Sequence, residues 1–178
     1  MTYKTENNIW EDMISLLNEA LSAKNISGMT VMRAFQPTDV TGKNLVLINK
    51  VSSKRYGWIG RHNKIIDGEM QYVEDYFQEM RFQISVLKKI NLKDSTDITA
   101  EDIANMLIDY LLSNEGLQNL RSQGYMPIRI IDVRNQNFIN QNDNYQFNPN
   151  FDFVCTIKQV IVKNQAIIDG CSFSLKGV

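Results

Sequence analysis

A segment near the C-terminus, residues 127–153, constrains the fold more than any other part of the chain. It reads PIRIIDVRNQNFINQNDNYQFNPNFDF, so a β-branched run leads into an amide-rich stretch and then into an aromatic strand. β-Branched residues suit a half-buried pleated sheet, whereas asparagines favour turns because their side chains bond nearby backbone groups. The sequence therefore predicts two strands joined by a long loop.

The aromatic residues within and after this predicted loop favour an ordered loop over a disordered one. Loops of such length without secondary structure are uncommon in compact domains, and those that occur are usually functional or disordered. Disordered segments are poor in aromatic residues, but this segment carries Phe138, Tyr145, Phe147 and Phe151. We therefore expect a partner to pack against the loop.

Length and composition predict one domain, spanning residues 1–178. With 178 residues and 43% hydrophobic content, the chain can bury a sizeable core but is short for two domains. It shows no secretory signal pattern and no apolar run long enough to span a membrane, which predicts a soluble protein made in the cytoplasm. A disulfide between Cys155 and Cys171 is an alternative, but a reducing compartment favours free thiols.

Charge is unevenly distributed along the chain. Residues 28–68 carry seven basic and two acidic residues, whereas residues 69–115 carry ten acidic and four basic residues. Segments of opposite sign suit head-to-tail contacts between copies, in which one surface meets a different surface of the neighbour. On the charges alone, the alternative that both segments are ordinary solvated faces is favoured.

Apolar spacing predicts two main helices. Residues 9–21 carry an apolar stripe at helical spacing, with Asn8 as the expected N-cap. The second helix follows Thr99, its expected N-cap, and has acidic residues in its first turn, where the helix dipole favours them. A short helical turn then ends at Gly124, which suits a left-handed cap, and the chain re-enters a sheet at Ile128.

The remaining segments predict strands. Residues 29–35 and 45–51 are separated by turn residues, and we expect them to be antiparallel neighbours. Residues 70–89 fit both helical and strand periodicity, while residues 151–161 alternate as a long strand that a last strand, residues 166–175, follows. The fold class indicated is α+β: a single domain with an antiparallel (mixed) β-sheet and two main helices packed on one face.

A basic segment, residues 52–68, is a candidate contact site. It reads SSKRYGWIGRHNKIIDG and combines glycines, basic residues and aromatics. One hypothesis is a protruding basic loop that touches DNA phosphate or an acidic partner. The alternative is a solvated hairpin whose Tyr56 and Trp58 pack on the sheet, and the general behaviour of charge runs favours this alternative.

The sequence lacks the residue sets that common catalytic sites require. His62 is the only histidine, so Ser-His-Asp, Cys-His and multi-histidine metal sites are not available within one chain. Neither a P-loop nor a strand-linked GxGxxG pattern is present. An acidic group could suggest a magnesium-dependent nuclease, but its spacing gives no convergence: Asp67, Glu69, Glu74, Asp75 and Glu79. We expect no enzyme, no metal and no cofactor.

An ordered set of short motifs resembles the tail terminator or neck (tail-completion) proteins of long-tailed bacteriophages. The resemblance rests on DVRN at residues 132–135, then Phe138 and Asn140, then FNPNFDF at residues 147–153. It is supported by Gly57-Trp58, Phe82-Gln83-Ile84, and the Gly124 and Pro127 that open the segment. One departure is Gln136, where the family would have a proline.

The resemblance implies a structural role. Such a protein forms a ring, with a hexamer expected, at the head-proximal end of the tail tube, where it ends tail growth and joins the tail to the neck. Its implied partners are further copies of itself, the tail tube protein and the neck or connector proteins, with genomic DNA passing through the lumen and no membrane. The resemblance also implies a long central strand in the second half of residues 70–89. The alternative function is a nucleic-acid-binding or metal-dependent nuclease accessory domain.

Two groups of residues are predicted to form the oligomer or partner interface. Arg134 has a planar donor fork that could bind Asp132, Asp152 or a carboxylate of a neighbouring subunit, and a purely internal role for it is an equal alternative. The predicted interface residues are Lys54, Arg55, Trp58, Arg61, Asp132, Arg134, Asn135, Phe138, Asn140, Asn142, Tyr145 and Phe147.

Overall fold

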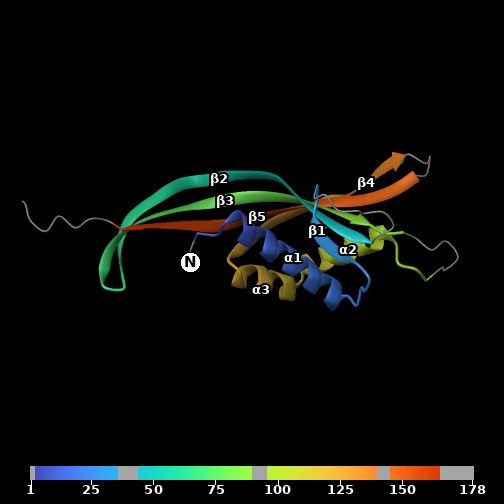
Figure 1. The fold of residues 1–178 in the computed structure, drawn as a ribbon, viewed down its shortest axis with the longest axis horizontal. Helices are drawn as coiled ribbons and strands as arrows, with labels where there is room; N and C mark the ends of the chain where they lie inside the picture. The colour runs from blue at the N-terminus through green and yellow to red at the C-terminus, as the bar shows by residue number, and fades with distance from the viewer. Residues whose placement is uncertain (1–2, 36–43, 90–95, 140–144, 165–178) are drawn as a thin grey trace, which may run out of the picture.

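The protein is an α+β structure in which three helices cover one face of a five-stranded mixed sheet (Figure 1). The computed structural model describes residues 3–35, 44–89, 96–139 and 145–164. The strand order is β1-β2-β3-β5-β4, which makes β3 and β5 central and leaves β4 at one edge. The predicted fold class, with the helices on one face, is confirmed.

The helices begin at side chains that satisfy their first backbone N–H groups. Helix α1, Glu6–Ala23, is capped by Thr5, whose hydroxyl accepts a hydrogen bond from the backbone N–H of Asn8 at 3.3 Å. The prediction of Asn8 as the N-cap was therefore wrong, because Asn8 instead returns the bond as the third residue of a capping box. Helix α2, Ala100–Leu112, starts at Thr99 as predicted.

The last helix ends where the sequence indicated. Helix α3, Asn114–Ser122, follows α2 directly, and Ser113 ends one helix and caps the next. Gly124 then has a φ of 86°, the left-handed conformation predicted for it. The following strand begins at Tyr125 rather than at Ile128, and Pro127 is tolerated within it because the strand lies at the sheet edge.

Four of the described strands are longer than the sequence indicated, whereas β1 is shorter. Strand β1, Thr30–Arg33, precedes β2, Leu45–Ile66, and β3 runs from Glu69 to Leu87. Strand β4, Tyr125–Ile139, pairs with β5, Tyr145–Asn164. Residues 70–89 are therefore strand almost throughout, because β3 pairs with a neighbour on each side and this pairing overrides the helical spacing of the first half.

Strands β1 and β2 pair in parallel, so the prediction of antiparallel neighbours was wrong. An antiparallel pair can be joined by a tight turn, whereas a parallel pair needs a longer connection that returns the chain to its starting end. Residues 34–44 provide that length, and the turn residues predicted between the strands lie outside the described residues. The predicted strand 166–175 and Cys171 lie outside the described residues as well.

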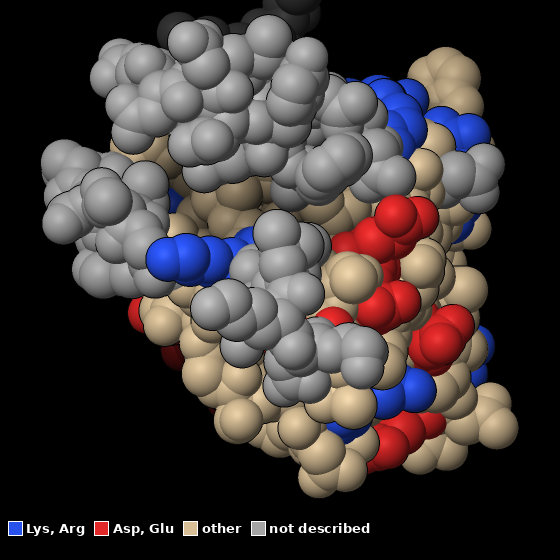
Figure 2. Space-filling model, turned by 90° about the vertical axis from the view of Figure 1, so that its right-hand side faces the viewer, with Lys and Arg blue, Asp and Glu red and all other residues tan. Residues whose placement is uncertain are grey.

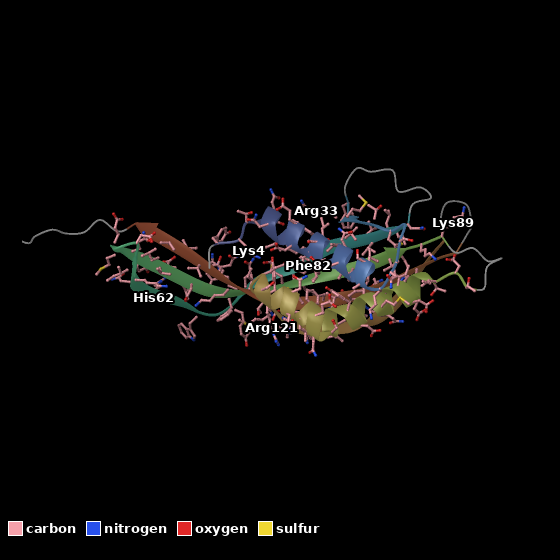
Figure 3. All side chains as sticks on the ribbon, turned by 90° about the horizontal axis from the view of Figure 1, so that it is seen from below. Lys4, Arg33, His62, Phe82, Lys89 and Arg121 are labelled. Atoms are coloured by element: carbon pink, nitrogen blue, oxygen red, sulfur yellow. The ribbon has the colours of Figure 1, made fainter. Side chains whose placement is uncertain are left out.

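The core lies between the helices and the side of the sheet that faces them. On β3 and β5 the buried side chains alternate with those of the opposite face, so that Met80, Phe82 and Ile84 pair with Cys155, Phe153 and Phe151. The ring of Trp10 on α1 meets that of Phe82 edge-on, with centroids 5.9 Å apart. Figure 3 shows Phe82 beneath the helices and His62 far out on the sheet, beyond the helix layer.

Buried polar groups fasten the N-terminal segment to the sheet. The Gln159 side chain accepts a hydrogen bond from the backbone N–H of Lys4 at 2.9 Å and donates one to the Lys4 carbonyl at 3.2 Å. Tyr125 is fully buried and donates its hydroxyl proton to Asp12 on α1 at 2.7 Å. Burial, together with the Asp12 carboxylate, raises the pKa of Tyr125 well above its usual value, so the phenol stays protonated.

Replacing Phe82 by alanine tests the position of the core. The ring is fully buried under α1, so we expect the Phe82→Ala variant to lose about 3–5 kcal/mol of unfolding free energy, measured by urea denaturation. Phe77 on the opposite face of the same strand is 38% exposed and is the matched control. Equal losses for Phe77→Ala and Phe82→Ala would contradict this assignment of the two faces.

Candidate interaction surfaces

The sheet extends beyond the helices at both ends, and the predicted interface residues fall into two groups at these extensions (Figure 1). The first group lies on the arm, which we define as the hairpin of β2 residues 51–66 and β3 residues 69–80. The second lies on the β4–β5 hairpin, residues 132–150. At the usual rise per strand residue, the β5 positions level with Lys54 and Arg134 are roughly 20 Å apart, and those level with Arg61 and Tyr145 are roughly 50 Å apart. The chain therefore does not bring them together within one copy.

Strand β2 has a bulge within the arm, and the bulge carries an exposed tryptophan. Tyr56 pairs with Phe77 and Gly60 pairs with Asp75, so residues 57–59 stand opposite a single residue of β3. Gly57 has a φ of 76°, and a Cβ atom at Gly60 would collide with the Asp75 carboxylate. Both positions thus favour glycine. The bulge leaves the Trp58 side chain 97% exposed.

Residues 52–66 belong to strand β2, interrupted by the bulge, and do not form a loop, because β3 pairs with them on one side. The solvated hairpin of the alternative is present, since most of these residues are exposed. Its aromatic packing was wrong, because Tyr56 is 60% exposed and Trp58 is almost fully exposed. A large exposed aromatic residue at a built bulge is typical of a contact site.

Most charges on the arm are paired within the chain. Lys54 contacts Glu79 at 2.9 Å, Arg61 contacts Glu74 at 3.8 Å, and the guanidinium of Arg55 lies 4.6 Å from the ring centre of Tyr76. The opposite-sign segments predicted from the sequence thus face each other across one hairpin. They do not form two separate charged surfaces in this part of the chain.

The acidic residues of the arm form no metal site. Asp75 is bound by Lys158 at 2.6 Å, and this hydrogen bond holds the pKa of the Asp75 carboxyl below its usual value. His62 is exposed. Over the described ranges, no group of three or more His, Cys, Asp or Glu side chains is placed to hold a metal ion. A groove of about 490 Å³ on the arm is lined by valines and by the Asp75–Lys158 pair.

An arginine–aspartate cluster lies near the base of the β4–β5 hairpin, on the face of the sheet opposite the helices. The Asp152 carboxylate is 2% exposed and accepts from Arg81 and from Arg134, the latter at 2.6 Å. Both guanidinium groups bind the same oxygen, Oδ2, while Oδ1 is buried without a partner. Arg134 therefore has one of the partners anticipated for it, Asp152.

The remaining residues of the second group are placed by backbone only. Asp132, Asn135 and Phe138 lie on β4, and Tyr145 and Phe147 lie on β5, where Asn137 pairs with Phe147. The strands continue to Ile139 and resume at Tyr145, so the long loop predicted from the asparagines was wrong. Cross-strand pairing outweighs the turn preference of these residues. Asn140 and Asn142 lie outside the described residues.

Sequence reasoning missed Arg81 and Arg129. The contact of Arg81 with Asp152 requires the register of β3 against β5, which no local pattern encodes. Arg129 is exposed on β4 opposite Val154, within a segment interpreted from its β-branched residues. The alternation of the strands was the only available signal.

Cys155 is buried and free, in agreement with the prediction of a free thiol for this residue. Burial raises the pKa of the Cys155 thiol to about 12, so little reactive thiolate exists at neutral pH. None of the helices in the described part of the chain is long and apolar enough to cross a membrane.

In the described part of the chain, the predicted interface residues thus lie on two extensions of the sheet beyond the helices. The chain belongs to the E217 gateway protein gp29 family, whose sequence model matches residues 9–167. This is a phage head–tail gateway family, which supports the phage neck part of the resemblance. No curated protein matches the chain.

Removing the Asp152 carboxylate tests the arginine–aspartate cluster. We expect Asp152→Ala to lower the unfolding free energy by about 2 kcal/mol, because two guanidinium groups lose the shared anion, although solvent screens these half-exposed side chains. Thermal and urea denaturation measure the loss. Asp109→Ala, which removes an exposed carboxylate on α2, is the control. An Asp152→Ala variant as stable as this control would contradict a role in holding β3, β4 and β5 together.

Thiol labelling tests the burial of Cys155. In a Cys171→Ser background, we expect a chromogenic disulfide reagent to react with Cys155 at least about a hundredfold more slowly in buffer than in denaturant, because reaction requires both exposure and the thiolate. Labelling that is equally fast under both conditions would show that β5 opens readily at this position.

Proposed function

We propose that this gateway protein forms a ring of six copies at the head-proximal end of the tail, where it ends growth of the tail tube and joins the tail to the neck. The chain acts as one tail-terminator-like domain, residues 1–178. Genomic DNA passes through the lumen of the ring. Its partners are the tail tube protein on one side and the neck or connector proteins on the other.

The observation that carries this proposal is the pair of open edges of the sheet. Within the described residues, β1 pairs only with positions 45–48 of β2, so the rest of this 22-residue strand has one neighbour, β3. Strand β4 is the opposite edge. Unpaired strand edges bind further strands through backbone hydrogen bonds. Two different open surfaces on one copy suit the heterologous contacts from which rings are built.

The two groups of predicted interface residues have separate roles in the proposal. Lys54, Arg55, Trp58 and Arg61 on the arm contact the neighbouring copy or the next ring. On the β4–β5 hairpin, Arg134 contacts a neighbouring copy. The other predicted residues of this hairpin contact a neck or tail component: Asp132, Asn135, Phe138, Asn140, Asn142, Tyr145 and Phe147. Membership of a phage head–tail family supports partners of this kind.

Particle mass measured by light scattering across protein concentration tests ring formation. We expect a species of six copies, or a shift from one copy toward six, and ring-shaped particles in negative stain. Addition of this protein to growing tail tubes should halt their elongation. A protein that stays monomeric and also fails to join purified tails would contradict the proposal, whereas weak association alone would not, since the tube can complete the interface.

The Trp58→Ala variant tests whether Trp58 contributes to tail joining without contributing to the stability of the fold. The side chain is almost fully exposed, so we expect the thermal midpoint to remain within about 1 °C of the wild-type value while tail joining falls at least about tenfold. Ile65→Ala, which shortens another exposed apolar side chain of the same arm, is the matched control and should join tails normally. Equal activity of the two variants would remove Trp58 from the interface.

A further inference from the structure

The face of the sheet opposite the helices is basic near β4. Among the described side chains near β4, Arg81, Arg129 and Arg134 share this face with the carboxylate of Asp152. Glu79, farther along β3 on the same face, is paired with Lys54. Three arginines and one aspartate give a net charge of +2. Asp152 positions two of the guanidinium groups by binding them through one oxygen, and both groups remain partly exposed, at 36% and 49%. We name this set the arginine face.

Apolar side chains adjoin the arginine face on strand β4. Met126 is 50% exposed and pairs with Thr156 on the side away from the helices. Ile128 is 51% exposed and sits where the register shifts between Pro127 and Arg129. The arginine face and Met126 form one surface, and Ile128 is exposed beside Arg129 on the same strand. A mixture of apolar and basic groups is typical of protein interfaces.

The solvent side of helix α2 has the opposite charge. Its sequence, AEDIANMLIDYLL, contains three acidic residues and neither lysine nor arginine. Glu101, Asp102 and Asp109 are all exposed and fall within about 100° of one another around the helix. Leu112 at the end of the same stripe is 56% exposed. Figure 2 views the end of the molecule from which β4 and β5 project and shows Asp and Glu side chains gathered along one side of it.

We propose that the arginine face of one copy binds the acidic stripe of α2 on a second copy. The proposal rests on the ring described above and names its subunit contact. Both surfaces carry exposed apolar side chains beside their charges, and their lengths agree. The 13-residue helix is about 20 Å long, and residues 126–134 of β4 span about 25–30 Å.

Charge complementarity favours a second copy of the chain as the partner of the arginine face. Arginine binds carboxylates through planar paired donors, and Asp152 already holds two guanidinium groups in place. Every copy of the chain carries the acidic stripe, so a second copy can be the partner. A nucleic acid fits less well, because its phosphate backbone would not bind the apolar side chains of Met126 and Ile128. The contact joins two different surfaces, so each copy uses one surface toward each neighbour and the chain of contacts can close into a ring.

Two charge reversals, studied separately and mixed, test this contact. Arg129→Glu reverses charge on the arginine face without removing a partner of Asp152, and Asp109→Lys reverses charge on the stripe. We expect each variant alone to lose self-association by at least about tenfold, measured by light scattering. Mixed in equal amounts, the two should assemble again, because positions 129 and 109 then carry opposite charges at every interface of an alternating ring. Matched controls are Arg121→Glu on α3 and Glu11→Lys on α1, both exposed and outside the two surfaces.

The possible results separate this contact from the ring itself. If the wild-type protein forms no oligomer even on tail tubes, the proposed ring fails. If it does form one and both reversals assemble like the controls, the ring stands and this contact is overturned. Loss with Arg129→Glu alone, without rescue on mixing, would also overturn it, since the arginine face would then meet itself or another partner. Wild-type binding to duplex DNA in a gel-shift assay that Arg129→Glu abolishes, with assembly unchanged, would assign the face to DNA instead.

Discussion

Burial of one side of β3 and β5 beneath the helices is the constraint on which the rest of the structure depends. Phe82 and Phe153 pair across these two strands and are fully covered, and Trp10 of α1 meets Phe82 edge-on. Because side chains alternate along a strand, the same pairing turns every second residue to the opposite face. The sheet therefore has one face that the helices cover and one face on which charged side chains pair with one another.

The lengths of the strands determine what is left open. The helices cover the middle of the sheet. The arm of β2 and β3 runs on beyond them beside β5, and β4 and β5 run on in the other direction. The two extensions at opposite ends of the sheet are the regions to which the proposed function assigns separate partners.

Charges on the open face are arranged in two ways, with different consequences. On the arm, basic and acidic side chains pair across neighbouring strands, as in Lys54–Glu79 and Lys158–Asp75, which largely neutralises that region. Near β4 one carboxylate serves two arginines, which leaves positive charge on the surface. Excess charge beside exposed apolar groups is the pattern expected where a protein partner, rather than solvent, completes the surface.

The sequence alone determined the fold class, the cap of α2 at Thr99, the left-handed Gly124 and the resemblance to phage neck proteins, because each depends on local residue chemistry or on an ordered motif. It also singled out Trp58 and Arg134. Tertiary structure decided the parallel pairing of β1 with β2, the strand conformation of the asparagine-rich segment and the exposure of Trp58. It also decided the sharing of Asp152 by Arg81 and Arg134. These features depend on which strands lie side by side and in what register, and backbone pairing between distant segments overrides the local preferences that a sequence displays.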